Sequence, residues 1–271
     1  MKNLKIPFDE ESATVISAIE DGTPLPYKKL NQLIHDEIDA GSKNIILNDV
    51  CGQRFIGAAL KGDIKIYVNG VPGNDMGIFM DGPELYINGN AEDQAGNTMN
   101  EGKIIINGNT GDVTGLSARG GEIYVKNSVG FRVGIHIKEY KGKKPAVIVG
   151  GGCKDYFGEY MAGGILVVLG LRISDDGVEE IEEKLYGNCL GSGIHGGSIY
   201  IRTADIPEDF LGIGAKIVEF TEEDKKKISP YIKNFCEYFD IDESKIWEKP
   251  FKVLKPASKR PYGSNYCINI V

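Results

Sequence analysis

A strand-like pattern that returns every nineteen residues constrains the fold of this 271-residue chain more than any other feature. In the segment 63–70, DIKIYVNG, apolar residues alternate with others, as in a strand with one buried face. Steps of nineteen residues from Ile66 and Val68 reach apolar residues three times in succession. The two columns are Ile66, Leu85, Ile104, Ile123 and Val68, Ile87, Ile106, Val125. A fixed period of this length is the signature of a repeat architecture.

Glycine keeps the same period and extends the repeat in both directions. Five extra residues in the loop 138–145 and fourteen within 171–186 restore the phase further along the chain. A step back of twenty residues from the first strand reaches Ile46, which indicates one more coil before it. The glycine column contains Gly57, Gly77, Gly96, Gly115, Gly134, Gly158 and Gly191. Glycine suits a tight turn or a close backbone approach, so each coil is expected to turn at this point.

Stacked coils explain this pattern better than other folds do. Each strand points two apolar residues inward, such as Ile104 and Ile106, while the residue between them, Ile105, points outward. Two inward residues bury little surface by themselves, but stacked coils join them into continuous apolar columns. The repeat is too short for a βαβ unit, which needs about thirty residues. We therefore expect an all-β core, a right-handed parallel β-helix of about eight coils of ~19 residues across 43–203.

The flanking segments 1–42 and 204–271 carry helical signals. Residues 27–40 place Leu30, Leu33, Ile34 and Ile38 on one helical face, and Gly41 is a C-terminal stop, so this helix is expected to cap the first coil. Residues 221–239 predict a pair of helices. Thr221 and Ser229 would be their N-caps, with Pro230 at a first helical position. Residues 250–271 are expected to form an extended tail.

Composition narrows the class of protein. No run reaches eighteen consecutive apolar residues, and the start MKNLKIPFDEES lacks a signal-peptide core, so we expect a cytoplasmic protein outside the membrane. Five widely separated cysteines without a Cys-x-x-Cys pair argue against a zinc site or an iron–sulfur cluster held by this chain. A net charge of −8 without a dominant basic stretch makes nucleic acid an unsuitable partner.

Several glycine rows resemble a known family. The rows GDVTGLSARGG, GCKDYFGEYMAGG and GNCLGSGIHGG, together with GQRFIGAAL and EYMAGGILVVLG, closely resemble the GXGXG β-helix domain of glutamate synthase. That domain is the C-terminal part of the large subunit, also called domain 3, and the resemblance covers about residues 44–203. One of the component chains of formylmethanofuran dehydrogenase is in the same fold family. The chain looks like a free-standing form of the domain, although the helix before the first coil and the tail FKVLKPASKRPYGSNY have no counterpart there.

The resemblance implies a scaffolding role. In that family a class II amidotransferase domain hydrolyses glutamine, and an FMN and iron–sulfur domain adds the ammonia to 2-oxoglutarate. The β-helix domain packs against both. The resemblance therefore implies that this chain has no catalytic, cofactor or metal site of its own, and that FMN and iron–sulfur clusters lie on partner subunits. Association with a further copy of the chain is also open.

One polar column offers an alternative. Asp93, Asp112 and Asp155 occupy equivalent coil positions, in a column completed by Arg54, Asn74, Phe131 and Asn188. Stacked carboxylates could bind a cation or act as acid and base on a polysaccharide. More often, such side chains satisfy the amides of a turn. A component of a formylmethanofuran dehydrogenase-like complex and an independent carbohydrate-active enzyme thus remain alternatives to the glutamate synthase scaffold.

The remaining signals are weaker. Gly191–Gly196 spells G-x-G-x-x-G, but a strand rather than a helix follows, so nucleotide binding is not expected there. His35, His136 and His195 lie in unrelated contexts. The loop 138–144 could attract an acidic partner or be a solvated loop. In the tail, Lys259, Arg260 and Tyr262 combine residue types favoured at interfaces, and either docking on a partner or packing on the rod would suit them.

Overall fold

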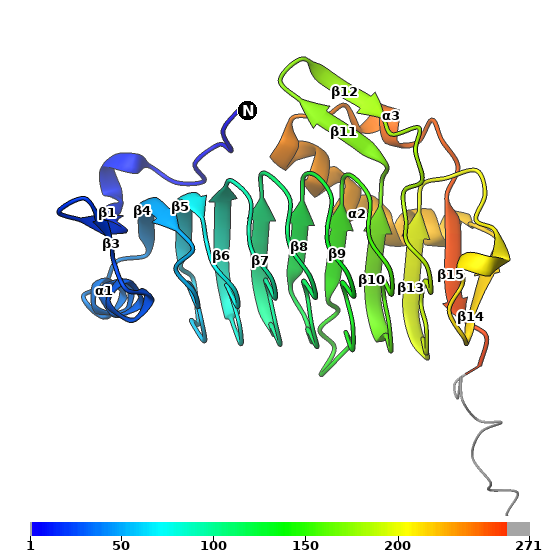
Figure 1. The fold of residues 1–271 in the computed structure, drawn as a ribbon, viewed down its shortest axis with the longest axis horizontal. Coiled ribbons are helices and arrows are strands. Elements are labelled where there is room, and N and C mark those ends of the chain that lie inside the picture. Colours follow the sequence, from blue (N-terminus) through cyan, green and yellow to red (C-terminus); the bar gives the residue numbers. More distant parts are fainter. Residues whose placement is uncertain (1, 259–271) are drawn as a thin grey trace, which may run out of the picture.

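A computed structural model describes residues 2–258 and confirms a parallel β-solenoid with helices at its flanks (Figure 1). Each coil contributes one strand to a parallel ladder, and neighbouring strands pair in chain order. The ladder from the second coil onward aligns Ile66 with Leu85 and Leu85 with Ile104, as the repeat predicts. The strands are β4 (Asn44–Cys51), β5 (Lys65–Val71), β6 (Asp81–Asn88), β7 (Glu101–Ile106), β8 (Glu122–Val125), β9 (Ala146–Val149), β10 (Ala162–Val168) and β13 (Gly196–Ile201).

The number of regular turns is about six, slightly fewer than the eight coils expected. Eight strands in this range are joined by seven connections. The six from β4 to β10 contain no further strand, although the one between β8 and β9 carries the five-residue insertion. The seventh carries the fourteen-residue insertion, which forms an antiparallel hairpin of β11 (Leu171–Ser174) and β12 (Gly177–Glu180). The hairpin projects from the coil stack (Figure 1).

The first coil differs by one residue from the sequence-based alignment. Ile45 and Leu47, rather than Ile46, pair with the inward residues Ile66 and Val68, and a register irregularity follows Leu47. Ile46 instead packs outside the solenoid, because successive strand residues face opposite sides. A one-residue slip therefore exchanges the two faces of a strand.

Two apolar clusters lie on opposite sides of this sheet. The inner cluster fills the solenoid with the repeated aliphatic columns, and the side chains of Ile104 and Ile106 are fully buried there. The outer cluster contains the alternate strand residues, including Tyr67, Ile105 and Tyr124, under other segments of the chain. Both faces of the sheet are thus buried, as is usual for parallel strands.

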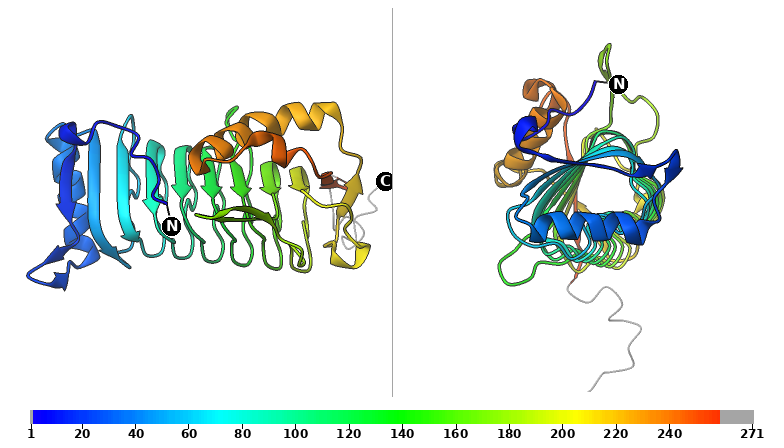
Figure 2. Two further views of the ribbon diagram at one scale, coloured as in Figure 1. Left: turned by 90° about the horizontal axis from the view of Figure 1, so that it is seen from above. Right: turned by 90° about the vertical axis from the view of Figure 1, so that its left-hand side faces the viewer.

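The N-terminal opening of the solenoid is closed as expected. Helix α1 (Tyr27–Asp39) lies across the end of the coil stack and buries Leu30 and Ile34 in the inner cluster (Figure 2). Gly41 follows the helix with a positive φ of 106°. Before α1, a 3-10 turn (Glu10–Ser12) precedes strand β1 (Thr14–Ser17), which adds to the ladder, and the short hairpin of β2 (Ile19–Glu20) and β3 (Thr23–Pro24).

The C-terminal opening is closed by strands. β15 (Lys252–Pro256) pairs antiparallel with β13, and β14 (Ala215–Val218) pairs antiparallel with β15 at the edge of the eleven-stranded sheet. A 3-10 turn (Glu208–Phe210) lies between β13 and β14. Leu254 and Ile206 complete the inner cluster, so part of the expected tail belongs to the sheet.

Residues 221–239 form one helix, not the expected pair. Helix α2 (Glu222–Phe239) begins at Thr221, where a capping box confirms the predicted N-cap, and continues through Pro230. Ser229 is not a cap, since its hydroxyl donates to the carbonyl of Lys225 at 2.7 Å within the helix. Helix α2 lies along the side of the rod (Figure 2), and the apolar face with Ile228, Ile232 and Phe235 packs on the outer cluster. The short helix α3 (Glu243–Ile246) follows.

A buried arginine ties these C-terminal elements together. Arg202, at the end of β13, forms a bidentate pair with Glu180 of β12 through two contacts of 2.8 Å. Its guanidinium also donates to the carbonyls of Lys245, Ile246 and Leu169. The hairpin and α3 are therefore fixed to the ladder by one fully paired charge, which satisfies the requirement for burying it.

The glycine column turns the chain on the inner side of each coil. All seven glycines have φ between 63° and 76°, a region that L side chains adopt rarely. A Cβ atom on Gly96 would also lie 2.5 Å from Cδ1 of Ile123 in the inner cluster. Glycine is thus required for two reasons. It adopts the positive φ of the turn, and its missing side chain leaves room for the aliphatic residues of the neighbouring coils.

We expect Gly96→Ala to lower the free energy of unfolding by about 2–4 kcal/mol, because it adds overpacking to the cost of a positive φ. Gly62→Ala is the matched control, since Gly62 has φ of 85° but nothing within 4 Å of a Cβ atom. It should lose about 1–2 kcal/mol. Urea denaturation of both variants measures the difference, and equal losses would show that the inner contact is unimportant.

Candidate functional site

The aspartate column is used by the backbone of the following coil. Oδ1 of Asp93 accepts from the amide of Asp112 at 2.8 Å, and Oδ1 of Asp112 accepts from the amide of Phe131 at 2.9 Å. Asp155 repeats this contact with the amide of Asn188 at 2.7 Å. One oxygen of each carboxylate is therefore committed to holding adjacent coils together.

Small residues beside the aspartates make these contacts possible. A Cβ atom on Gly111 would lie 2.0 Å from Oδ1 of Asp93, and one on Gly130 would lie 2.2 Å from Oδ1 of Asp112. The carboxylate thus occupies the space that a side chain in the next coil would need. The carboxylates therefore act as hydrogen-bond acceptors for the turns. This role argues against a pair of catalytic carboxylates that acts on a polysaccharide.

Replacing Asp93 and Asp112 by asparagine tests this role. Asn keeps the acceptor oxygen, so Asp93→Asn with Asp112→Asn should leave the free energy of unfolding within about 0.5 kcal/mol of the wild type. The matching pair of alanine substitutions should lose about 1 kcal/mol per site, because each leaves an amide without its acceptor. Chemical denaturation compares them; a large loss in the asparagine variant would show that the charge itself is needed.

The three histidines are not brought together. His35 is exposed on α1, His136 stacks on Tyr160 with ring centroids 5.1 Å apart, and Nδ1 of His195 lies 3.0 Å from the carbonyl oxygen of Gly193. Across residues 2–258, no group of three or more His, Cys, Asp or Glu side chains is arranged to hold a metal ion. The G-x-G-x-x-G run leads into strand β13, so it lacks the helix N-terminus that a dinucleotide site uses.

The buried thiols are poor nucleophiles. Burial raises the pKa of Cys153 and of Cys236 to about 12, so both thiols stay protonated at neutral pH. Cys51 is exposed at the end of β4, and Cys189 is half-buried. Because the reactive form of cysteine is the thiolate, neither buried residue is suited to covalent catalysis.

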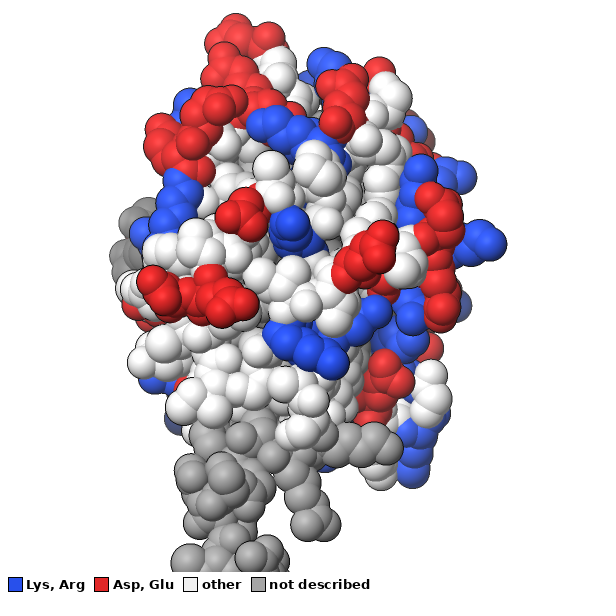
Figure 3. Space-filling view, turned by 90° about the vertical axis from the view of Figure 1, so that its right-hand side faces the viewer, with Lys and Arg blue, Asp and Glu red and all other residues white. Residues whose placement is uncertain are grey.

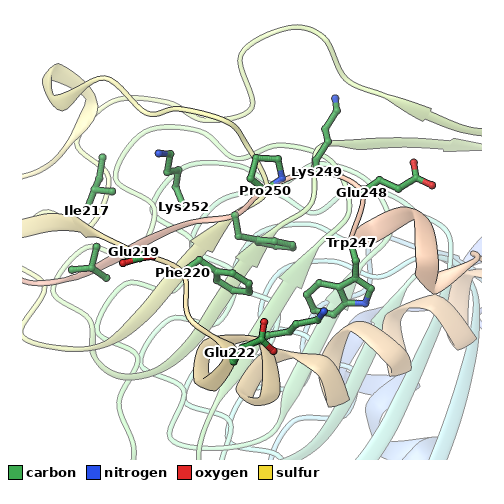
Figure 4. A pocket seen from close by; sticks show the side chains of 12 residues that line it. Ile217, Glu219, Phe220, Glu222, Trp247, Glu248, Lys249, Pro250 and Lys252 are labelled. Carbon is green, nitrogen blue, oxygen red and sulfur yellow. The ribbon is translucent and has the colours of Figure 1, made fainter.

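An open groove of about 810 Å³ lies between the segments that enter α2 and leave α3 (Figure 4). Phe220 stacks on Phe251 with centroids 5.3 Å apart, and Trp247 lies 5.7 Å from Phe251. Lys225 lies over the Trp247 ring at 5.1 Å. The sequence did not predict this groove. Its aromatic residues come from position 220 and from residues 247–251, and no repeat or motif relates these positions to each other.

A network of charged and polar side chains surrounds Asp224 at the start of α2. Burial opposes ionisation of Asp224, but Lys255 at 2.9 Å, Thr221 and the hydroxyl of Tyr200 stabilise the carboxylate and lower its pKa to about 2. Tyr200 belongs to β13 and Lys255 to β15, so the carboxylate anchors the helix to the sheet. This is a structural charge network rather than a site open to substrate, since Asp224 is 1% exposed.

Acid should loosen this anchor. Because the pKa of Asp224 is lowered on folding, its contribution to stability is present above about pH 4 and is lost as the pH falls through about 2. The stability gap between the wild type and Asp224→Asn should therefore be constant above about pH 5 and narrow below about pH 4. Denaturation curves between pH 7 and pH 2 measure it, with the exposed Glu222→Gln as control. A gap independent of pH would contradict the assignment.

Positive and negative side chains are mixed on the surface of the C-terminal end. Figure 3 shows lysine and arginine interspersed with aspartate and glutamate over that face. In the loop 138–144, Lys143 pairs with Asp81 and Glu101, and Lys144 lies 3.8 Å from Glu139. Part of the positive charge of this loop is thus neutralised locally. Lys259, Arg260 and Tyr262 lie outside the described residues, so their expected contacts stay predictions.

These observations define a class of protein: a closed parallel β-solenoid built from glycine turns, whose polar columns bind adjacent coils. A sequence profile described as the GXGXG motif matches residues 33–256. The chain therefore belongs to the GXGXG family, the family of the glutamate synthase large-subunit domain. It is also 46% identical over 252 residues to the uncharacterized protein MJ1350 of Methanocaldococcus jannaschii, covering 91% of this chain and 95% of that protein. No helix in the described part of the chain is long and apolar enough to cross a membrane.

Proposed function

We propose that this protein is a non-catalytic structural subunit of a glutamate synthase-like complex that acts in the cytoplasm. Its partners would be an FMN and iron–sulfur subunit and a class II glutamine amidotransferase subunit, which together carry out glutamine-dependent glutamate synthesis. The observation that carries the proposal is the GXGXG match across residues 33–256, which includes the whole coil stack. In this proposal FMN and the iron–sulfur clusters are bound by the partners.

The physical character of the solenoid suits a scaffold. Its interior is filled with aliphatic side chains such as Ile104, Ile123 and Leu166, all of them buried, so the described part of the rod is stiff and offers no internal channel for substrate. Its aspartate column is engaged in contacts between coils. A rigid body of this kind can hold two catalytic subunits in a fixed relation while ammonia passes between them.

The chains that co-purify with the protein test the proposal. Affinity capture under native conditions should recover a flavoprotein with iron–sulfur clusters and a class II amidotransferase chain in near-stoichiometric amounts, identified by mass spectrometry and by the flavin absorbance. A molybdenum or tungsten protein in their place would favour the formylmethanofuran dehydrogenase alternative. Recovery of neither kind of partner, or hydrolysis of a polysaccharide that is lost with Asp93→Asn and Asp112→Asn, would overturn the scaffold proposal.

A further inference from the structure

The N-terminal arm, residues 2–8, is an extended segment on the outer face of the sheet. It runs from the β1 end of the rod towards the middle of the coil stack (Figure 2). Leu4 is buried in the outer cluster, and Ile6 and Phe8 pack against the same cluster. Lys5, between the first two, is exposed. The arm therefore places apolar side chains at every second position, as a strand with one buried face does.

Side chains of the solenoid, rather than its backbone, hold the main chain of the arm. The hydroxyl of Tyr67 donates to the carbonyl of Leu4 at 2.8 Å, and Nδ2 of Asn107 donates to the carbonyl of Lys2 at 2.9 Å. The amide of Leu4 donates to Oδ1 of Asn88 at 3.3 Å. In the described part of the chain, no backbone–backbone hydrogen bond involves the arm. These contacts recognise an extended main chain and place no demand on its side chains.

Negative charge meets the far end of the arm. Lys2 forms an ion pair with Asp240, the C-cap of α2. The amide of Lys2 donates to Oδ1 of Asp175, at the tip of the inserted hairpin. Lys126, which is buried after β8, also lies close enough to Asp175 to interact with its charge. Without Lys2, two carboxylates would face this one lysine, so a cation is favoured at this end.

The arm is held less firmly than the helix that covers the rest of this face. Helix α2 buries Ile232 and Phe235 completely and is anchored by the buried carboxylate of Asp224. Of residues 2–8, only Leu4 is buried, and the ion pair of the arm is exposed to solvent. Exposed ion pairs contribute little stability, and segments with few buried contacts open locally. The arm can therefore leave its place while the coil stack stays folded.

From this geometry we infer that the surface beneath the arm is a recognition site for an extended segment of a partner protein, and that the arm occupies this site in the free protein. The segment carries a cation first and apolar side chains at every second position after it, as Lys2, Leu4 and Ile6 do in the arm. The arm site consists of Tyr67, Asn88, Asn107, Asp175 and Asp240. The inference goes beyond the proposed function and does not depend on which proteins the partners are.

An occupied site conceals its affinity. A segment on the same chain competes at an effective concentration on the order of 1 mM. The apparent affinity for a segment supplied in solution is reduced to the fraction of molecules in which the site is open. Loosening the arm should therefore strengthen the binding of a free peptide while the site itself is unchanged.

An acetylated peptide with the sequence of residues 2–9, KNLKIPFD, is the probe, and fluorescence anisotropy with the full-length protein measures its binding. Lys2→Ser with Leu4→Ser, the loosened-arm variant, changes the arm but not the site. It should bind the probe at least about tenfold more tightly than the wild type, because more of its sites are open. Asn3→Ser with Lys5→Ser is the matched control, since these arm residues are exposed, and it should bind the probe as the wild type does.

A change in the site itself should have the opposite effect. In the loosened-arm variant, Tyr67→Phe should weaken binding of the probe about fivefold, as expected for the loss of one hydrogen bond. Tyr86→Phe is the control, because the hydroxyl of Tyr86 donates to Glu84 at 2.7 Å rather than to the arm. It should leave binding unchanged.

The probe can be varied in the same way. A probe with Leu4→Ser and Ile6→Ser should bind the loosened-arm variant at least about tenfold more weakly, since both apolar contacts are lost. A probe with Lys2→Glu should also bind more weakly, because it brings a carboxylate to Asp175 and Asp240. Equal binding of these probes would contradict the stated chemistry of the segment.

Hydrogen exchange of the wild type tests opening of the arm without any variant. The amide of Leu4 should exchange at least about a hundredfold faster than the ladder amides of β5, because the arm opens locally. Exchange at the same rate would show that the arm leaves only when the protein unfolds, and would overturn the inference. Failure of the probe to bind the loosened-arm variant, with thermal unfolding showing a folded protein, would also overturn it.

Discussion

The contact between the turn glycines and the inner aliphatic ladder is the constraint on which the structure depends. Each coil must reverse direction at a positive φ, and the space inside that turn is occupied by a side chain from a neighbouring coil, as Ile123 occupies it at Gly96. No other residue meets both demands without strain. Because the same contact recurs along the column, the coils stack in register and the interior remains closely packed.

A second core converts this tube into a larger fold. The outer face of the parallel sheet carries apolar residues such as Tyr124 and Ile148, which water would otherwise reach. Helix α2 covers them, and its position is set by Asp224 at one end and by the contact of Asn234 with the Tyr124 hydroxyl further along. Arg202 fixes the inserted hairpin and α3 in the same region. Residues 222–256 therefore form an integral layer of the rod.

The polar groups of the coil stack serve the fold. Asp93 and Asp112 satisfy backbone amides of the next coil, and Asn69, Asn88 and Asn107 form a ladder of side-chain hydrogen bonds across successive strands. A scaffold whose interior and sheet face are both buried is consistent with these contacts.

The sequence alone determined the repeat, the parallel ladder, the glycine turns, the capping helix and the N-cap at Thr221, because each depends on a local pattern or a fixed period. It misplaced Ile46 by one residue, since an irregularity after Leu47 leaves no mark in the period. It divided α2 at Pro230, although packing on the outer core keeps that helix continuous. The antiparallel strands β14 and β15 and the aromatic groove were decided by tertiary structure alone. Their residues come from separate segments or coils, and only folding brings them together.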